Sequence, residues 1–96
     1  MYLKVYETGT DIMVAVCDKL LIGKRFTQDD LILDISESFY KGSIAKYDEV
    51  VDALNSATIA NLVGPEAVKC AIENGFIDEC NVIKIDGVPH AQMVLI

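Results

Sequence analysis

The 96-residue chain has no tryptophan, two prolines, one histidine and no long apolar run. Its longest apolar runs, such as residues 13–17 and 93–96, are far shorter than the ~20 residues that a membrane-spanning helix needs. The opening MYLKVYETGTD alternates polar with apolar residues and lacks the continuous apolar core of a signal peptide. We therefore expect a cytoplasmic protein with no membrane partner.

Cysteine is scarce too. Cys17, Cys70 and Cys80 are an odd number and lie far apart, which excludes a disulfide framework and favours free thiols in a reducing compartment. Zinc sites usually take ligand pairs two to four residues apart, and no such pair is present, so we predict no metal. The acidic neighbours of Cys80 disfavour the thiolate that a nucleophile needs.

Basic side chains are outnumbered: Lys and Arg total 8 against 15 Asp and Glu, for a formal charge of −7. This balance opposes general binding to nucleic acid, and no DNA partner is expected. The basic cluster Lys19, Lys24 and Arg25, in DKLLIGKRF, is typical of a solvated turn. The alternative is a local RNA contact at Lys24 and Arg25, to which the ring of Tyr40 would contribute if exposed.

Apolar residues are abundant for so small a protein. They make up 52% of the sequence, and the mean hydropathy is +0.34. A short chain has much surface for its volume, so part of this apolar surface is expected to contact a partner. That partner is either another protein or a second copy of the chain.

The first half of the chain reads mainly as strands. Residues 2–7 and 11–17 predict a β-hairpin around Gly9, and residues 31–35 alternate as a third strand. Residues 20–22 fit a helical turn, a bulge or a continuing strand equally well.

The second half predicts two helices. Apolar spacing indicates a helix over 44–56 with Ser43 as its N-cap. After an extended segment at 58–62, Pro65 suits the first position of a second helix, which Asn74-Gly75 ends.

Two strand-like runs, NVIKID and HAQMVLI, close the chain around the Asp86-Gly87 turn. The order β-β-β-α-α-β-β predicts one α+β domain over residues 1–96, a mostly antiparallel sheet of about five strands packed against two helices.

The stretches MYLKVYET, LIGKRF, FYKG, NLVGPEAV and GVPHAQ together resemble a family of small archaeal proteins, the domain-of-unknown-function family numbered four-two-four. The resemblance covers nearly the whole chain. It implies an archaeal cytosolic protein without an assigned activity, whose genes lie among information-processing genes, and so favours a translation-associated role. None of these stretches is a catalytic motif, so no residue is carried over as catalytic.

The stretch IDGVPHAQ supplies the candidate binding residues Asp86, Pro89, His90 and Gln92. An imidazole can act as a general base, with Asp86 fixing its tautomer and Gln92 offering a donor from the same strand face. The alternative is structural: His90 bonds a backbone group and holds the Pro89 turn, with a cis Val88–Pro89 bond as one variant.

Phosphate binding at VGPEAV is disfavoured. Pro65 lacks an N–H, Glu66 already places negative charge at the helix start, and no glycine-rich loop of a nucleotide site is present. Gly64 is better explained as a cap or turn, and no cofactor is predicted.

The function predicted from these features is a non-enzymatic module that docks on a protein partner, and the resemblance favours a partner in the translation or RNA machinery. The alternative is a small enzyme or ligand-binding protein with its site around His90, and a third interpretation is a structural homodimer. A concave pocket around His90 would favour the enzyme or ligand-binding alternative.

Overall fold

The computed structural model describes residues 1–95, and its main feature is a sheet of 6 strands in the order β5-β1-β2-β6-β8-β7. The strands are β1 (Tyr2–Thr8), β2 (Asp11–Cys17), β5 (Ser43–Ile44), β6 (Ile59–Val63), β7 (Ile83–Ile85) and β8 (Val88–Val94). All neighbours are antiparallel except β2 and β6, which run parallel. The predicted α+β class with a mostly antiparallel sheet is confirmed.

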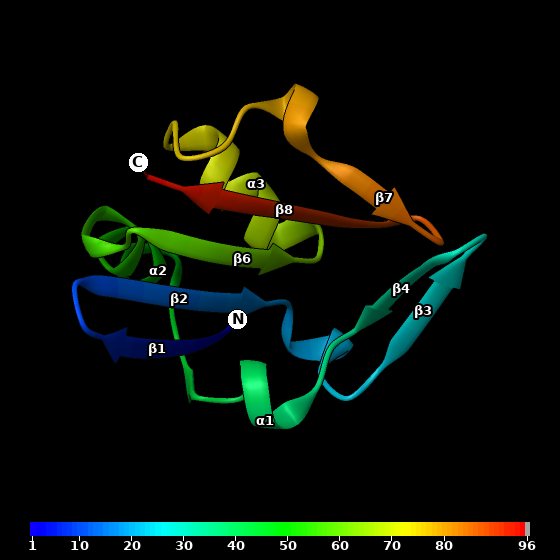
Figure 1. Ribbon diagram of the computed structural model, residues 1–96, viewed down its shortest axis with the longest axis horizontal. Helices are drawn as coiled ribbons and strands as arrows, with labels where there is room; N and C mark the ends of the chain where they lie inside the picture. Colours follow the sequence, from blue (N-terminus) through cyan, green and yellow to red (C-terminus); the bar gives the residue numbers. More distant parts are fainter. Residues whose placement is uncertain (96) are drawn as a thin grey trace.

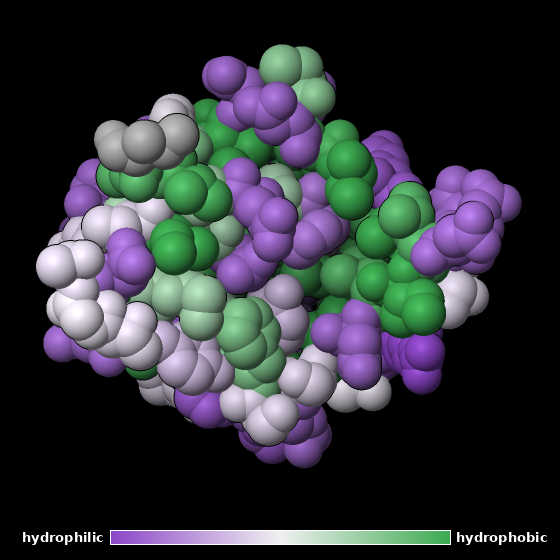
Figure 2. Space-filling view, viewed as in Figure 1, coloured by the Kyte–Doolittle hydropathy of each residue, from purple (hydrophilic) through white to green (hydrophobic). Residues whose placement is uncertain are grey.

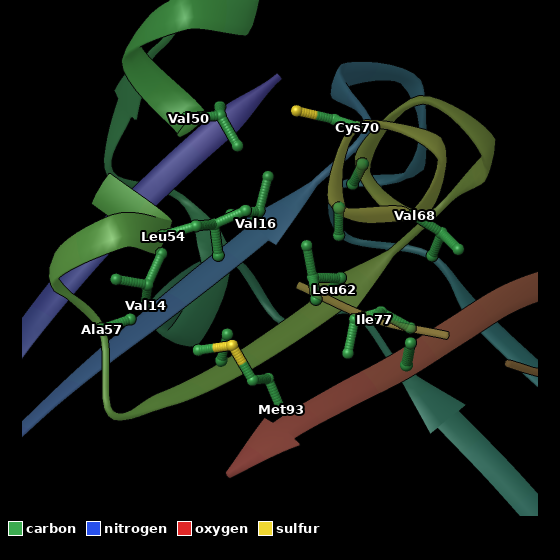
Figure 3. Packing of buried hydrophobic residues seen from close by; sticks show 14 of the residues in the cluster. Val14, Val16, Val50, Leu54, Ala57, Leu62, Val68, Cys70, Ile77 and Met93 are labelled. Carbon is green, nitrogen blue, oxygen red and sulfur yellow. The ribbon is translucent and has the colours of Figure 1, made fainter. Parts of the chain in front are cut away.

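Two helices, α2 (Tyr47–Ser56) and α3 (Pro65–Glu73), cover one face of this sheet and lie behind it in Figure 1. Alternate strand residues point to this side because successive side chains of a strand face opposite ways. The resulting core, shown in Figure 3, includes Val14, Val16, Leu62, Ala91 and Met93 from the strands and Val50, Leu54, Ala67, Cys70 and Ala71 from the helices. No helix within residues 1–95 is long and apolar enough to cross a membrane.

The opposite face is only partly covered. A hairpin of β3 (Arg25–Gln28) and β4 (Leu31–Asp34) and the short helix α1 (Glu37–Tyr40) lie against one end of it, around a second core that includes Cys17, Val63, Leu33, Ile35 and Tyr40. Side chains of β1 hold α1 in place: Lys4 Nζ donates to the carbonyl of Ser38 at 2.7 Å, and Tyr6 Oη donates to that of Phe39 at 2.7 Å.

The structure differs from the sequence prediction at the third strand. Residues 31–34 do form a strand, but they pair with β3 in a separate two-stranded sheet. Of residues 20–22, for which a helical turn, a bulge and a strand fitted equally well, Leu20 and Leu21 belong to the 3-10 helix η1 (Lys19–Leu21), and Ile22 follows it. The 3-10 helix η2 (Glu79–Asn81) precedes β7.

The first predicted helix begins three residues later than expected, at Tyr47. Ser43 does not cap it, because residues 43–44 pair with β1 and extend the sheet. Lys46 stands at the N-cap instead, and its backbone N–H donates to Glu49 Oε1 at 2.9 Å. The second helix begins at Pro65 and ends at Glu73, before Asn74-Gly75, as predicted.

Candidate functional site

Part of the sheet face opposite α2 and α3 is left uncovered by the hairpin and α1. Register places its residues in rows: Met13, Ile59 and Val94 lie across three strands, Asn61 lies opposite Gln92, and His90 opposite Ile83. We call this surface the open face, made up of Met13, Ile59, Asn61, Ile83, His90, Gln92 and Val94. His90 and Gln92 share this face because they are two positions apart along β8, so that prediction is confirmed.

Polar side chains in the middle of the open face are linked by hydrogen bonds. Gln92 Nε2 donates to Asn61 Oδ1 at 2.7 Å, across the β6–β8 pair. His90 Nδ1 lies 3.1 Å from the carbonyl oxygen of Leu62. Because a carbonyl oxygen only accepts, Nδ1 must carry the hydrogen, and Nε2 of the neutral ring is left as an acceptor.

Apolar side chains flank this polar centre. Val94 is 63% exposed and Ile83 is 48% exposed, while Met13 and Ile59 are half-buried. Figure 2 shows a polar area between two apolar areas on this side of the molecule. The open face therefore combines exposed apolar surface with hydrogen-bonding groups, as the contact surfaces of protein interfaces do.

Two other residues of the predicted His90 site lie elsewhere. Asp86 sits in the β7–β8 turn at a φ of 52°, and its backbone N–H donates to Gln28 Oε1 at 2.7 Å. Asp86 does not fix the tautomer of His90, since Nδ1 bonds Leu62. Pro89 faces α3 on the other side of the sheet, and residues 1–95 contain no cis peptide bond, so the cis Val88–Pro89 variant is wrong.

The candidate RNA contact loses its aromatic component. Tyr40 is 5% exposed, and burial raises the pKa of its hydroxyl to about 12, with a smaller contribution from Cys17. Its ring therefore cannot stack on a base. Lys24 and Arg25 are exposed, with Arg25 opposite Asp34 at the start of the β3–β4 hairpin.

Sequence reasoning missed Asn61. It is a polar residue in a strand that is otherwise apolar, IANLV, and it alternates with the inward-facing Ala60 and Leu62. The polar Asn61 within this apolar run was the feature of the sequence that could have identified it. It indicates a residue on the exposed side of a strand, but the pairing with Gln92 follows only from the three-dimensional register.

The carboxyl ends of the parallel strands β2 and β6 are the usual ligand position in an open sheet of this kind, and here Asp18 occupies it. Asp18 Oδ2 accepts from the backbone N–H of Glu66 at 3.0 Å, and Oδ1 accepts from that of Ala67 at 2.9 Å. The first free N–H groups of α3 are thus already paired with a carboxylate, which disfavours a bound phosphate. Gly64 is the N-cap of α3, as predicted.

Two of the three cysteines, Cys17 and Cys70, are buried thiols. Burial, with a smaller effect of Asp18, raises the pKa of the Cys17 thiol to about 11, and burial also raises that of Cys70. Cys80 is exposed. Within residues 1–95 no group of three or more His, Cys, Asp or Glu side chains is placed to hold a metal ion.

A hollow beside His90 bears on the ligand-binding alternative. Its volume is about 240 Å³, and it is lined by Asn81, Ile83, His90, Ala91 and Gln92. Small-molecule sites usually measure roughly 300–1,000 Å³. The hollow is thus small for a substrate site, and it brings only one titratable side chain, His90, to its wall.

Comparison with known proteins adds a family and a fold relative. The model of the family "Protein of unknown function (DUF424)" matches residues 6–96. The chain is similar to the crystal structure of an uncharacterized conserved protein from Methanopyrus kandleri, with a TM-score of 0.82 and 27% identity over 96% of this chain and 88% of that one. No curated protein matched.

Proposed function

Because the chain belongs to the DUF424 family, whose name assigns no activity, we propose from the geometry that it is a small non-enzymatic module that docks a protein partner on its open face. The partner would contact the Asn61–Gln92 amide pair and the apolar side chains beside it. The similar structure from Methanopyrus kandleri supports an archaeal setting. The translation machinery is the proposed source of the partner.

The observation that carries the proposal is the exposed amide pair next to Val94. This face leaves 63% of Val94 exposed to solvent. The acidic side chain on the same side of β2, Asp11, lies at the start of the strand, where it accepts a hydrogen bond from Thr58 Oγ1 at 3.1 Å. A protein surface can bury Val94 while bonding to the amide oxygen of Gln92 and to the Nδ2 of Asn61, which donates to Met13 Sδ at 3.8 Å. Burial of apolar surface with satisfied hydrogen bonds is what stabilises such interfaces.

Nucleic acid fits the open face less well than protein does. The cationic side chain nearest to it in register is Lys4, in the row of Ala15, Asn61 and Gln92, and Lys4 Nζ already bonds the Ser38 carbonyl. A surface of an acidic protein with so little positive charge would repel phosphates.

The test is affinity capture from the protein's own cytosol at about 0.15 M salt, where weak charge contacts are screened. Two variants with the same charge change are compared: Gln92→Lys on the open face and Asn55→Lys on the exposed side of α2. We expect the wild type and Asn55→Lys to capture the same protein and Gln92→Lys to lose it. Equal capture by both variants would contradict docking on the open face.

Two further measurements identify the class of partner. Loss of the captured protein on ribonuclease treatment would mean that RNA bridges it, against direct protein docking. Size-exclusion chromatography over a range of concentrations detects the alternative in which a second copy covers the open face. In that case the wild type and Asn55→Lys would dimerise while Gln92→Lys stayed monomeric.

A further inference from the structure

A groove of about 500 Å³ lies on the helix side of the sheet, away from the open face. One wall is the flank of α3 with Val68 and Ile72, and the floor includes Pro89 of β8. Val82, between η2 and β7, also lines the groove. This volume falls within the range of roughly 300–1,000 Å³ that is usual for small-molecule sites.

The groove exists because the helix layer ends before the sheet does. Helix α3 packs on β6 and β8, whereas β7 is the outermost strand and pairs only with β8. Lys84 of β7 pairs with Pro89 of β8. Both side chains are on the face of the sheet against which α3 packs at β6 and β8. The step between the flank of α3 and this edge strand leaves apolar side chains lining an open groove.

Charge at the groove has the opposite sign to that of the whole chain. Lys69 of α3 and Lys84 of β7 come from opposite walls, and Glu79 is the acidic residue among the lining side chains. Two ammonium groups against one carboxylate give the groove a net positive charge in a protein of formal charge −7. Apolar walls between two lysines match a ligand with an apolar body and a negative end.

We propose that this groove binds a small amphipathic carboxylate. The apolar part lies against Val68, Ile72 and Pro89, and the carboxylate is held between Lys69 and Lys84. A neutral molecule of the same length would gain the apolar contacts alone. The groove lies on the other side of the sheet from the open face, so this proposal can be tested independently of the proposed docking function.

The test uses three probes of equal chain length: octanoate, octan-1-ol and octylamine. Each is titrated into the isotope-labelled protein, and binding is followed through the backbone amide signals of α3 and β7. We expect octanoate to shift the signals around Val68, Ile72 and Lys84, and to bind more tightly than octanol. Octylamine should bind more weakly than octanol, because two ammonium groups repel a third.

Lysine variants separate charge recognition from apolar contact. Lys69→Gln and Lys84→Gln should each weaken octanoate about two- to fivefold, the range of an exposed ion pair, and leave octanol unchanged. Lys41→Gln, an exposed lysine after α1, is the matched control and should change nothing. All three positions are exposed, so the variants should fold, and melting curves check this.

The proposal is overturned if octanol binds as tightly as octanoate, because the groove would then be merely apolar. It is also overturned if the shifted signals map away from α3 and β7, or if no probe binds at millimolar concentration. Gln92→Lys on the open face should leave octanoate binding intact. A loss of octanoate binding in that variant would contradict the separation of the two sites.

Discussion

Asp18 fills the space in which a Cβ atom on Gly64 would lie. Such a Cβ would collide with the carboxyl group of Asp18, and Gly64 has a φ of 104°, where side chains are strained. The two residues follow adjacent parallel strands, and the Asp18 N–H donates to the Val63 carbonyl at 3.1 Å. Because β2 and β6 are adjacent and parallel, the carboxylate of Asp18, which follows β2, lies at the start of α3, which follows β6, and caps that helix.

Gly64→Ala should destabilise the protein by about 3 kcal/mol or more, since backbone strain and a collision in a packed site add together. Gly75→Ala is the matched control. Gly75 also has a positive φ, of 77°, but a Cβ there meets nothing within 4 Å, so the cost should be about 1 kcal/mol. Urea unfolding measures both. Equal losses would show that the contact with Asp18 adds nothing.

Asp18→Ala should cost roughly 2 kcal/mol, because two backbone N–H groups at the start of α3 lose their acceptor. Asp52→Ala, an exposed carboxylate on α2, should be close to neutral. In the double variant of Asp18→Ala with Gly64→Ala, the combined loss should be smaller than the sum. The two closest colliding atoms, which belong to the Asp18 carboxyl group, are gone, and only the Cβ of residue 18 remains within 3 Å of the added Cβ. Strict additivity would contradict the contact.

Elements with local signals were predicted well from the sequence. Gly9 between two alternating runs gave the β1–β2 hairpin, and Pro65 with Asn74-Gly75 bounded α3 to within a residue. Each of these signals acts through a backbone preference that neighbouring residues do not override.

Features that depend on distant contacts were not predictable. The sequence around Ser43 is typical of an N-cap, but Ser43 instead pairs with Leu3 of β1, forty residues earlier in the chain, as part of the sheet. The partner of Gln92 is Asn61, which is 31 positions away in the sequence, and only the β6–β8 register brings them together. The alternation of polar and apolar residues predicts on which face of the sheet a side chain lies, but it does not predict which residue of the adjacent strand lies next to it.

In the neutral form of the His90 ring, the hydrogen should lie on Nδ1, because the Leu62 carbonyl oxygen at 3.1 Å can only accept. Free imidazole favours the other tautomer, so the two states are distinguishable by the nitrogen chemical shifts of the ring, recorded at pH 8. We expect the shift of Nε2 to be that of an unprotonated nitrogen. A protonated Nε2 would mean that the bond to Leu62 is absent in solution.

His90→Gln should cost no more than about 1 kcal/mol, since the lost bond is a single side-chain to backbone contact on a half-buried residue. If the structural interpretation of His90 were the whole account, capture of the partner would be unchanged in this variant. Docking on the open face instead predicts weaker capture with nearly unchanged melting.

Alkaline pH should destabilise the protein through Cys17 and Tyr40. Both are neutral when protonated, and burial raises their pKa values to about 11 and about 12, from 9.0 and 10.0. Their contribution is complete below about pH 9, where the folded and unfolded chains both keep the protons. As the pH rises, the unfolded chain loses these protons first, so the free energy of unfolding falls until the folded-state pKa values are passed.

Urea unfolding at pH 8, 9.5 and 10.5 measures this fall. Cys17→Ala removes one of the titrating groups, so the decline should be shallower than in the wild type, while Cys70, whose pKa is also raised by burial, and Tyr40 still contribute to it. The variant is less stable throughout because a buried side chain is shortened. Cys80→Ala, at an exposed position, is the control and should follow the wild-type profile. A Cys17→Ala profile parallel to wild type across this range would show that the Cys17 thiol is not the group that titrates.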